Sequence, residues 1–312
     1  MAIRPVTPSD ANAIYEWLKG WHAESRKQGS FKISLADLVD WLTKGDVGGL
    51  ISIGQDSQMA ALLLHFWAYS TWQGPFTHIF HLHSLFSSKE YDSELVAKLL
   101  EQCKKRCSPR VQTYARTHLA QTFFQKTIGA QNLHQDEQWH LYSLQGEALA
   151  SLADKTSSLQ NVSIRSIDAA KDSAGIMELV KELAVFEKYS VERVQLTAAQ
   201  LRQDVDENRV MGFVALKEEA LVGYVLGYWA VEESIGRFLF MEDLFVQEAS
   251  RKRGIGLALW AHLAKTGVED DGCAPRLDWN VLGWNPARDF YAKLGAIDLT
   301  TRDCVQEFRL LG

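Results

Sequence analysis

Residues 241–260 read MEDLFVQEASRKRGIGLALW, and this segment predicts a strand, a turn and a helix in immediate succession. The apolar run at residues 238–246 is typical of a buried strand. The helix is indicated by Ile255, Leu259 and Leu263, which recur at helical spacing. A strand that leads through a short turn into a helix favours an α/β (α+β layered) fold with a mixed sheet.

The turn between the strand and the helix is basic and contains two glycines. Gly254 and Gly256 allow the backbone to approach a bound anion closely. The free N–H groups and the dipole at the start of the helix favour an anion there. Arg251, Lys252 and Arg253 would add charge-assisted hydrogen bonds. We therefore expect a pyrophosphate or similar group, although neither the Walker nor the full Rossmann pattern is present.

The same plan recurs in the first half of the chain. Four segments match in order, at offsets of 163, 162, 159 and 166 residues: Gly49–Ile53 with Gly212–Leu216, Ala60–Ala68 with Val222–Ala230, Leu82–Phe86 with Met241–Phe245, and Phe124–Ala130 with Phe290–Ala296. A period this long indicates two duplicated domains rather than a solenoid. Each half is expected to contain a mixed, mostly antiparallel sheet flanked by helices.

A polar, Ser/Thr-containing segment separates the two halves. It has little apolar periodicity after Leu152, which is typical of a linker. The predicted organisation is therefore a first domain at residues 1–146, a linker at 147–161 and a second domain at 162–312.

Charge is distributed unevenly along the 312 residues. Residues 1–155 hold 15 Lys+Arg and 15 Asp+Glu, whereas residues 156–312 hold 18 and 24 and carry the whole net charge of −6. An acidic half argues against nucleic-acid binding and suits a cationic ligand. Neither a signal peptide nor an apolar membrane span is found in the sequence, so we expect a cytoplasmic protein that does not bind membranes.

Two motifs of the second half carry a family resemblance. Arg251-x-x-Gly254-x-Gly256 after a strand resembles the acetyl-CoA pyrophosphate motif of the GNAT superfamily of N-acetyltransferases. The segment from Trp284-Asn285 to Gly295 is similar to the second cofactor segment of that superfamily. Residues 181–187 and 235–246 resemble the first helix and the matching strand of diamine (spermidine/spermine) and thialysine N-acetyltransferases. The resemblance covers roughly residues 162–312.

The resemblance implies a set of residues that bind acetyl-CoA, the acyl donor. Exposed backbone at the end of a splayed strand would hold the pantetheine and polarise the thioester carbonyl: Leu244, Phe245 and Val246. The turn would cradle the pyrophosphate: Arg251, Lys252, Arg253, Gly254, Ile255, Gly256 and Leu257. Asn285 would bond the pantetheine arm. Tyr291 would protonate the departing thiolate, because a phenol with a pKa near 10 stays protonated.

The resemblance also implies carboxylates for the amine. Glu242 and Asp243 would bind it and help to remove its proton. Neighbours on a strand point to opposite faces, so only one of them can line the cleft directly unless a bulge intervenes. Glu187 and Glu232 match positions that hold distal ammonium groups, and Trp284 is included among the substrate-binding residues. No metal site is predicted.

The first half lacks these features. Aligning Leu82 with Met241 places His83 and Ser84 at the positions of Glu242 and Asp243, and Gln125 at that of Tyr291. Residues 89–94 would then form an acidic turn that repels pyrophosphate. We expect a degenerate, non-catalytic domain that completes a pseudo-dimeric monomer or a homodimer.

The leading hypothesis is transfer of acetyl from acetyl-CoA to the primary amine of a diamine, a polyamine or a lysine-like compound, by direct attack in a ternary complex. Two alternatives stay open at this point: a non-catalytic acyl-CoA-binding or regulatory protein, and an acetyltransferase that acts on protein lysines.

Overall fold

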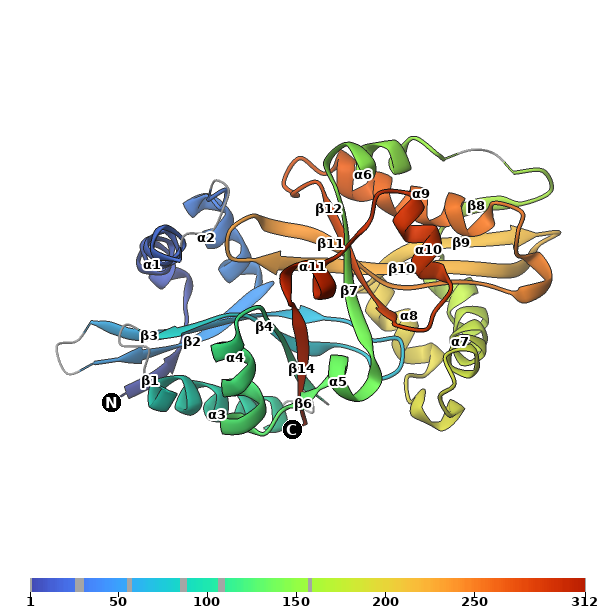
Figure 1. Cartoon of the computed structure of the whole chain (residues 1–312). Coiled ribbons are helices and arrows are strands. Elements are labelled where there is room, and N and C mark those ends of the chain that lie inside the picture. The colour runs from blue at the N-terminus through green and yellow to red at the C-terminus, as the bar shows by residue number, and fades with distance from the viewer. Residues whose placement is uncertain are drawn as a thin grey trace.

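The chain folds into two mixed sheets of seven strands, each flanked by helices (Figure 1). The computed structural model describes residues 2–25, 31–54, 58–84, 89–105, 110–156 and 159–311. The α/β layered fold expected from the sequence is confirmed.

The elements of the first half are β1 (Ala2–Pro5), α1 (Ala11–Glu24), α2 (Leu35–Lys44), β2 (Val47–Ile53), β3 (Met59–Ala68), β4 (Phe76–Ser84), α3 (Lys89–Lys105), β5 (Arg110–Ala115), α4 (His118–Thr122), β6 (Gln131–Asn132), α5 (Leu133–Glu137) and β7 (Trp139–Gln145).

The elements of the second half are α6 (Gly146–Ala153), β8 (Ser163–Ser166), α7 (Ala169–Phe186), α8 (Ala198–Asp206), β9 (Met211–Lys217), β10 (Ala220–Glu232), β11 (Gly236–Val246), α9 (Ile255–Glu269), β12 (Arg276–Leu282), α10 (Ala287–Lys293), β13 (Ile297–Asp298), α11 (Leu299–Asp303) and β14 (Gln306–Leu311). Within the described ranges, every helix is too short or too polar to cross a membrane.

The two halves repeat one order of elements, which confirms the predicted duplication. The series β1-α1-α2-β2-β3-β4-α3-β5 recurs as β8-α7-α8-β9-β10-β11-α9-β12. Both central strand pairs are parallel, β4 with β5 and β11 with β12, and their other neighbours are antiparallel.

The last strand of each half lies in the sheet of the other half. Strand β7 pairs with β12 from Arg276↔Gln145 to Leu282↔Trp139, and β14 pairs with β5 from Gln306↔Ala115 to Leu311↔Arg110. The strand orders are therefore β1-β2-β3-β4-β5-β14-β6 and β13-β7-β12-β11-β10-β9-β8. Figure 1 shows this exchange as green β7 beside orange β12, and red β14 near green β6. No local sequence pattern predicts this exchange.

The strand registers correct one predicted alignment. In the second half, Leu226 pairs with Asp243 and Gly227 with Met241, so Glu242 is the extra residue of a bulge. In the first half, Leu64 pairs with His81 and His65 with Ile79, so Phe80 is the extra residue. Phe80 and His81, not His83 and Ser84, therefore stand where Glu242 and Asp243 stand. The predicted match was three residues out of register because neighbouring apolar strand segments look alike.

Two segments expected to be irregular are helical. Residues 89–94, predicted as an acidic turn, form the start of α3, and Leu95 is fully buried. The positions that lead into α3, residues 85–88, lie outside the described residues. The first part of the predicted linker forms α6, whose Leu149 and Leu152 are buried in the core of the second half.

Each half also inserts a hairpin loop into the other. The loop between β3 and β4 reaches α8, where the Tyr69 hydroxyl donates to Asp204 at 3.0 Å. The carbonyl of Trp72 accepts from the backbone N–H of Leu196 at 3.0 Å. In the opposite direction, the carbonyl of Ser234 accepts from Lys32 at 2.9 Å. One buried core contains residues of both halves, so the two sheets form one packed body.

The strand exchange predicts that a mutation near the C-terminus loosens the N-terminal sheet. Phe308 on β14 is fully buried and stacks on Phe124 at 6.0 Å. Phe308→Ala should lower the free energy of unfolding by about 3–5 kcal/mol, because it leaves a cavity in that core. Hydrogen exchange should then accelerate in β5 before it accelerates in β10. Phe308→Leu, which leaves a smaller void, is the control. Faster exchange confined to β9 and β10 would contradict the arrangement.

Candidate active site

The bulge on β11 brings two carboxylates to one place. Glu242 has no partner in the ladder between β10 and β11, whereas Asp243 pairs with Leu226. Both side chains line the same two cavities, described below. The bulge therefore resolves the alternation problem, because neighbouring side chains would otherwise point to opposite faces.

Strands β11 and β12 separate directly beyond this point. Their parallel pairing ends at Met241↔Trp279, although β11 continues to Val246 and β12 to Leu282. The β12-facing backbone groups of Leu244, Phe245 and Val246 consequently lose their ladder partner. The splay exposes backbone N–H and C=O groups to a cleft between the strands, as the resemblance implied.

A cleft of about 250 Å³ fills the splay. Its walls come from β11, β12, α7 and the start of α10. The lining residues include Phe186, Glu187, Glu242, Asp243, Phe245, Val246, Arg251, Asn280, Asn285 and Tyr291. We call it the donor cleft.

The glycine turn lies at one end of the donor cleft. Gly254 has φ +81°, a left-handed conformation that strains other residues, and α9 begins directly after it at Ile255. The first N–H groups of α9 have no acceptor within the helix. Arg251 donates through Nε to the carbonyl of Val246 at 2.8 Å, which leaves its terminal nitrogens for an anion. Lys252 is exposed to solvent.

Tyr291 stands in an aromatic enclosure on the wall of the donor cleft. Its ring lies 4.9 Å from that of Trp279 and 5.1 Å from that of Trp260. Burial raises the pKa of the phenol above its ordinary value, so the hydroxyl keeps its proton at neutral pH. Asn285 lines the same cleft, and its Oδ1 accepts from the N–H of Ala287 at 2.9 Å. This contact engages the amide oxygen and turns the amide nitrogen into the group that can donate to a bound chain.

A larger cavity of about 450 Å³ lies between the two halves. Its acidic and basic lining residues are Glu137, Glu187, Glu242, Asp243, Glu307, Arg110, Arg193 and Arg309, and Ser70, Trp72, His78 and Tyr114 of the first half also line it. We call it the acidic cavity. It shares Glu187, Glu242, Asp243 and Asn280 with the donor cleft, so the two spaces meet at the bulge.

The carboxyl groups at this junction hold protons unusually tightly. Burial raises the pKa of Glu187 to about 8, and the neighbouring charge of Asp243 adds to the effect. Burial and the charge of Asp243 raise the pKa of Glu242 well above its usual range. The pKa of Asp243 is also raised by burial, although the Tyr224 hydroxyl donates to it at 3.0 Å. A bound cation would offset both the burial of these carboxylates and the repulsion between them.

Three contacts at the junction were not foreseen. The backbone N–H of Thr71, in the first half, donates to Glu242 at 3.2 Å. Glu307 accepts from Asn280 at 3.0 Å and from Gln112 at 2.8 Å, and burial raises its pKa to about 7. These residues reach the site only through the inserted loop and the exchanged strand β14.

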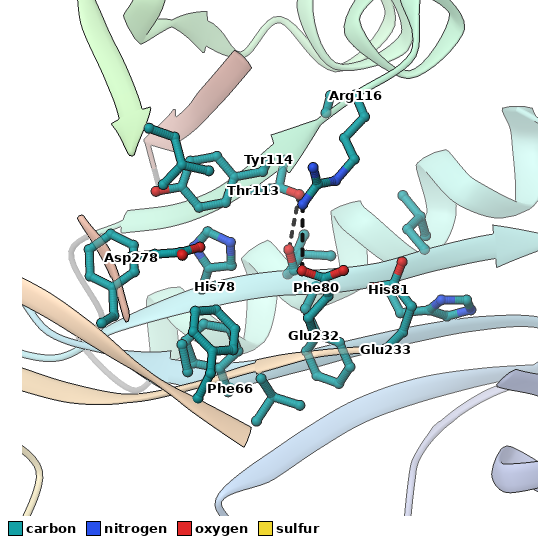
Figure 2. Close-up of a pocket in the computed structure, with 18 of the residues that line it drawn as sticks. Phe66, His78, Phe80, His81, Thr113, Tyr114, Arg116, Glu232, Glu233 and Asp278 are labelled. Atoms are coloured by element: carbon teal, nitrogen blue, oxygen red, sulfur yellow. Dashed lines mark hydrogen bonds and ion pairs between the residues drawn. The ribbon is translucent and has the colours of Figure 1, made fainter. Parts of the chain in front are cut away.

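Two predicted substrate-binding residues lie elsewhere. Glu232 pairs with Arg276 at 2.5 Å and with Arg116 at 3.5 Å, on the wall of a different cavity shown in Figure 2. Trp284 is 37% exposed, carries the ammonium of Lys188 over its ring at 4.1 Å, and lines neither the donor cleft nor the acidic cavity. The structure does bring Glu187, Glu242 and Asp243 together. Among the described residues, no group of three or more His, Cys, Asp or Glu side chains could hold a metal ion.

Sequence comparison points to one family. The profile of the acetyltransferase (GNAT) family matches residues 176–296. Thialysine N-epsilon-acetyltransferase of Caenorhabditis elegans is 36% identical over 138 residues, which cover 44% of this chain and 84% of that protein. The Bos taurus protein of the same name is 32% identical over 152 residues, or 45% of this chain and 88% of the relative.

Structural comparison extends the likeness to both halves. A tandem GNAT protein from the clavulanic acid biosynthesis pathway superposes with a TM-score of 0.60 at 13% identity, covering 99% of this chain and 98% of that one. A GCN5-related N-acetyltransferase from Sphaerobacter thermophilus gives 0.56 at 15% identity, with coverage of 99% and 95%. At these identities the likeness supports the tandem fold alone.

The raised pKa of Glu187 predicts how stability depends on pH. Its folded-state pKa of about 8 exceeds the ordinary 4.5, so the folded protein binds the proton more tightly than the unfolded chain. This stabilisation is fully present at low pH and is lost as pH rises through about 8. Glu187→Gln should therefore flatten the fall in unfolding free energy between about pH 5 and pH 8, measured by denaturant titration. The control is Glu178→Gln on the same helix, with an exposed side chain. Equal slopes in Glu187→Gln and wild type would refute the assignment.

Proposed function

Because this chain belongs to the GNAT family of acetyltransferases, we propose that its second half transfers the acetyl group of acetyl-CoA to the primary amine of a small cationic substrate. The products are the N-acetylated amine and free CoA. The transfer takes place by direct attack in a ternary complex. The spaces that would hold the donor and the amine adjoin each other, so no protein side chain has to carry the acetyl group between them.

One observation carries this proposal: the acidic cavity and the donor cleft adjoin each other and share Glu242 and Asp243 as lining residues. A cation placed against these carboxylates would have its nitrogen at the mouth of the splay. A buried cluster of carboxyl groups with raised pKa values is costly to ionise without a counter-ion. An ammonium group supplies that counter-ion, and the site therefore favours an amine over a neutral acceptor.

The donor cleft has the groups that acetyl-CoA requires. The N–H groups at the start of α9 face the turn where a pyrophosphate would lie. The open edge of β11 offers hydrogen bonds to the pantetheine chain, and the amide nitrogen of Asn285 offers another. The buried indole N–H of Trp279, on the cleft wall, has no hydrogen-bond partner among the residues that the structure describes. When bound, acetyl-CoA supplies an acetyl group activated as a thioester.

In this mechanism Glu242 and Tyr291 each carry out one proton transfer. Glu242, made more basic by its burial, accepts a proton from the ammonium group, directly or through a water molecule. Backbone N–H groups of β11 beyond Met241 polarise the thioester carbonyl. Tyr291 donates its proton to the sulfur as the C–S bond breaks and the C–N bond forms, and the proton that the nitrogen loses in becoming an amide restores the phenol. Asp243, held by Tyr224, keeps the amine in place.

The acidic cavity also favours a substrate that carries a carboxylate. Arg110 lies among the lining residues, and although burial lowers its pKa to about 10 it remains charged at neutral pH. Arg193 and Arg309 line the same space. A lysine-like amino acid complements both sets of charges, whereas a diamine complements only the carboxylates. This choice agrees with the thialysine acetyltransferases among the relatives.

The first half serves as the structural partner in this proposal. Its loop supplies the backbone N–H of Thr71 to Glu242, and its side chains close one wall of the acidic cavity. One chain thus provides both halves of a pseudo-dimer. In this proposal residues 1–146 form the non-catalytic domain and residues 162–312 the catalytic domain, and the two domains exchange their last strands.

An amine panel with acetyl-CoA tests the function directly. Release of free CoA thiol should be fastest with thialysine and lysine, slower with 1,4-diaminobutane and spermidine, and negligible with a lysine-containing peptide that cannot enter the acidic cavity. Mass spectrometry should find acetyl on the ω-nitrogen. Absence of thiol release with every amine would refute the proposal, and preference for the peptide would favour protein acetylation.

Tyr291→Phe tests the proton donor. The variant keeps the ring packed against Trp260 and Trp279 but removes the hydroxyl, so kcat should fall by about 10²-fold while KM for the amine changes little. The control is Phe290→Leu, the next residue, which is 37% exposed. Wild-type kcat in Tyr291→Phe would remove Tyr291 from the mechanism.

A further inference from the structure

A third cavity, lined by residues of both halves, takes no part in the proposed function. It has a volume of about 240 Å³ and lies between β4, β5, β10 and β11 (Figure 2). We call it the N-terminal cavity. Arg116, whose side chain is 35% exposed, lies at its solvent-facing side.

This cavity occupies the position that the catalytic junction has in the second half. The parallel pairing of β4 with β5 ends at Ile79↔Thr113, as that of β11 with β12 ends at Met241↔Trp279. Residues beyond that point on both strands line the cavity. The duplication has therefore preserved a splayed-strand cleft in the half that lacks the glycine turn.

At the bulge of the first half, aromatic side chains stand where the second half has carboxylates. Phe80 stands at the register position of Glu242, and His81 at that of Asp243. Figure 2 shows the Phe80 side chain in the cavity wall near Glu232. A cation would find no carboxylate at the two positions that carry the catalytic carboxylates in the other half.

The charged groups that remain in the wall are already engaged. Glu232 pairs with Arg276 at 2.5 Å, and Arg276 pairs with Asp278 at 2.5 Å. Arg116 is a second ion-pair partner of Glu232, and Glu233 also has a partner within the protein. A charged ligand would have to displace one partner of these existing ion pairs. The cavity therefore favours a neutral ligand over a charged one.

Flat aromatic surfaces face the same space from both halves. Phe66 stacks on His78 at 5.0 Å and 25°, and their counterparts Tyr228 and Phe240 stack at 5.1 Å and 21°. All four line the cavity. Burial lowers the pKa of His78 to about 3, so its ring is neutral and behaves as another aromatic surface.

We propose that the N-terminal cavity binds a neutral, planar aromatic small molecule about the size of a two-ring system. Rings stacked in offset or edge-to-face contact on these walls would supply the binding energy. The size follows from the volume, since a cavity of about 150 Å³ already holds benzene. The site is distinct from the acidic cavity, but the two share His78, Tyr114, Tyr228 and Phe240 as a common wall.

The shared wall connects the proposed ligand to the catalytic half. The Tyr114 hydroxyl accepts from the amide of Asn280 at 2.9 Å, and that amide also donates to Glu307. Asn280 lines both the acidic cavity and the donor cleft. A ring that presses on Tyr114 would therefore change KM for the amine without occupying its place.

Indole is the probe for the direct test, with calorimetry on the full chain saturated with free CoA, which has no acetyl group to transfer to lysine. We expect one binding site with Kd of about 10⁻⁴ M, which saturating lysine does not abolish. Ala120→Phe fills the cavity from α4 and should weaken binding at least about tenfold. Leu119→Phe, the adjacent residue with a side chain 64% exposed, is the matched control and should bind indole as the wild type does.

A second variant keeps the test independent of packing at Ala120. Phe80→Glu restores a carboxylate at the bulge and should abolish indole binding while acetyl-CoA still binds. Absence of saturable indole binding to the wild type, unchanged affinity in Ala120→Phe, or displacement of indole by lysine would each overturn the proposal. None of these readouts requires turnover, so failure here is distinct from failure of the proposed acetyl transfer.

Discussion

The exchange of β7 and β14 between the sheets is the constraint on which the rest of the molecule depends. Backbone hydrogen bonds from Trp139 to Gln145 complete one sheet, and those from Gln306 to Leu311 complete the other. Neither half can complete its sheet alone, so the halves are held at a fixed separation. The acidic cavity is the space this separation leaves, with walls from both halves.

Enclosure of the carboxyl groups between the two halves accounts for their raised pKa values. Glu242 is covered by the loop that carries Thr71, and this covering removes water from a carboxyl group that would otherwise be solvated. Removal of water raises its pKa, which makes it a stronger base and a better partner for an ammonium ion. The Arg110 guanidinium of the first half limits that effect. Under the proposed mechanism, the first half would therefore tune the pKa of Glu242 without touching the reacting atoms.

Much of the fold was predictable because apolar periodicity and the glycine turn are local. The turn at Gly254 and the helix at Ile255 follow from nearby residues, and the duplication follows from segments that match in order along the chain. The contacts of Thr71 and Glu307 were not predictable, because they depend on an inserted loop and a strand from the far end of the chain. Glu232 was assigned to the amine on its position in a motif, whereas its partner Arg276 lies on another strand.

The central claim is that the buried carboxyl cluster exchanges protons for a cationic amine. Calorimetric titration of the acetyl-CoA-free protein with lysine at about pH 7, in two buffers of different ionisation enthalpy, measures this exchange. Because the pKa of Glu187 lies at about 8, the cluster holds protons that an incoming ammonium group displaces. The account predicts proton release on binding, seen as a buffer-dependent enthalpy that shrinks in Glu187→Gln. Saturable binding whose enthalpy is the same in both buffers would contradict it.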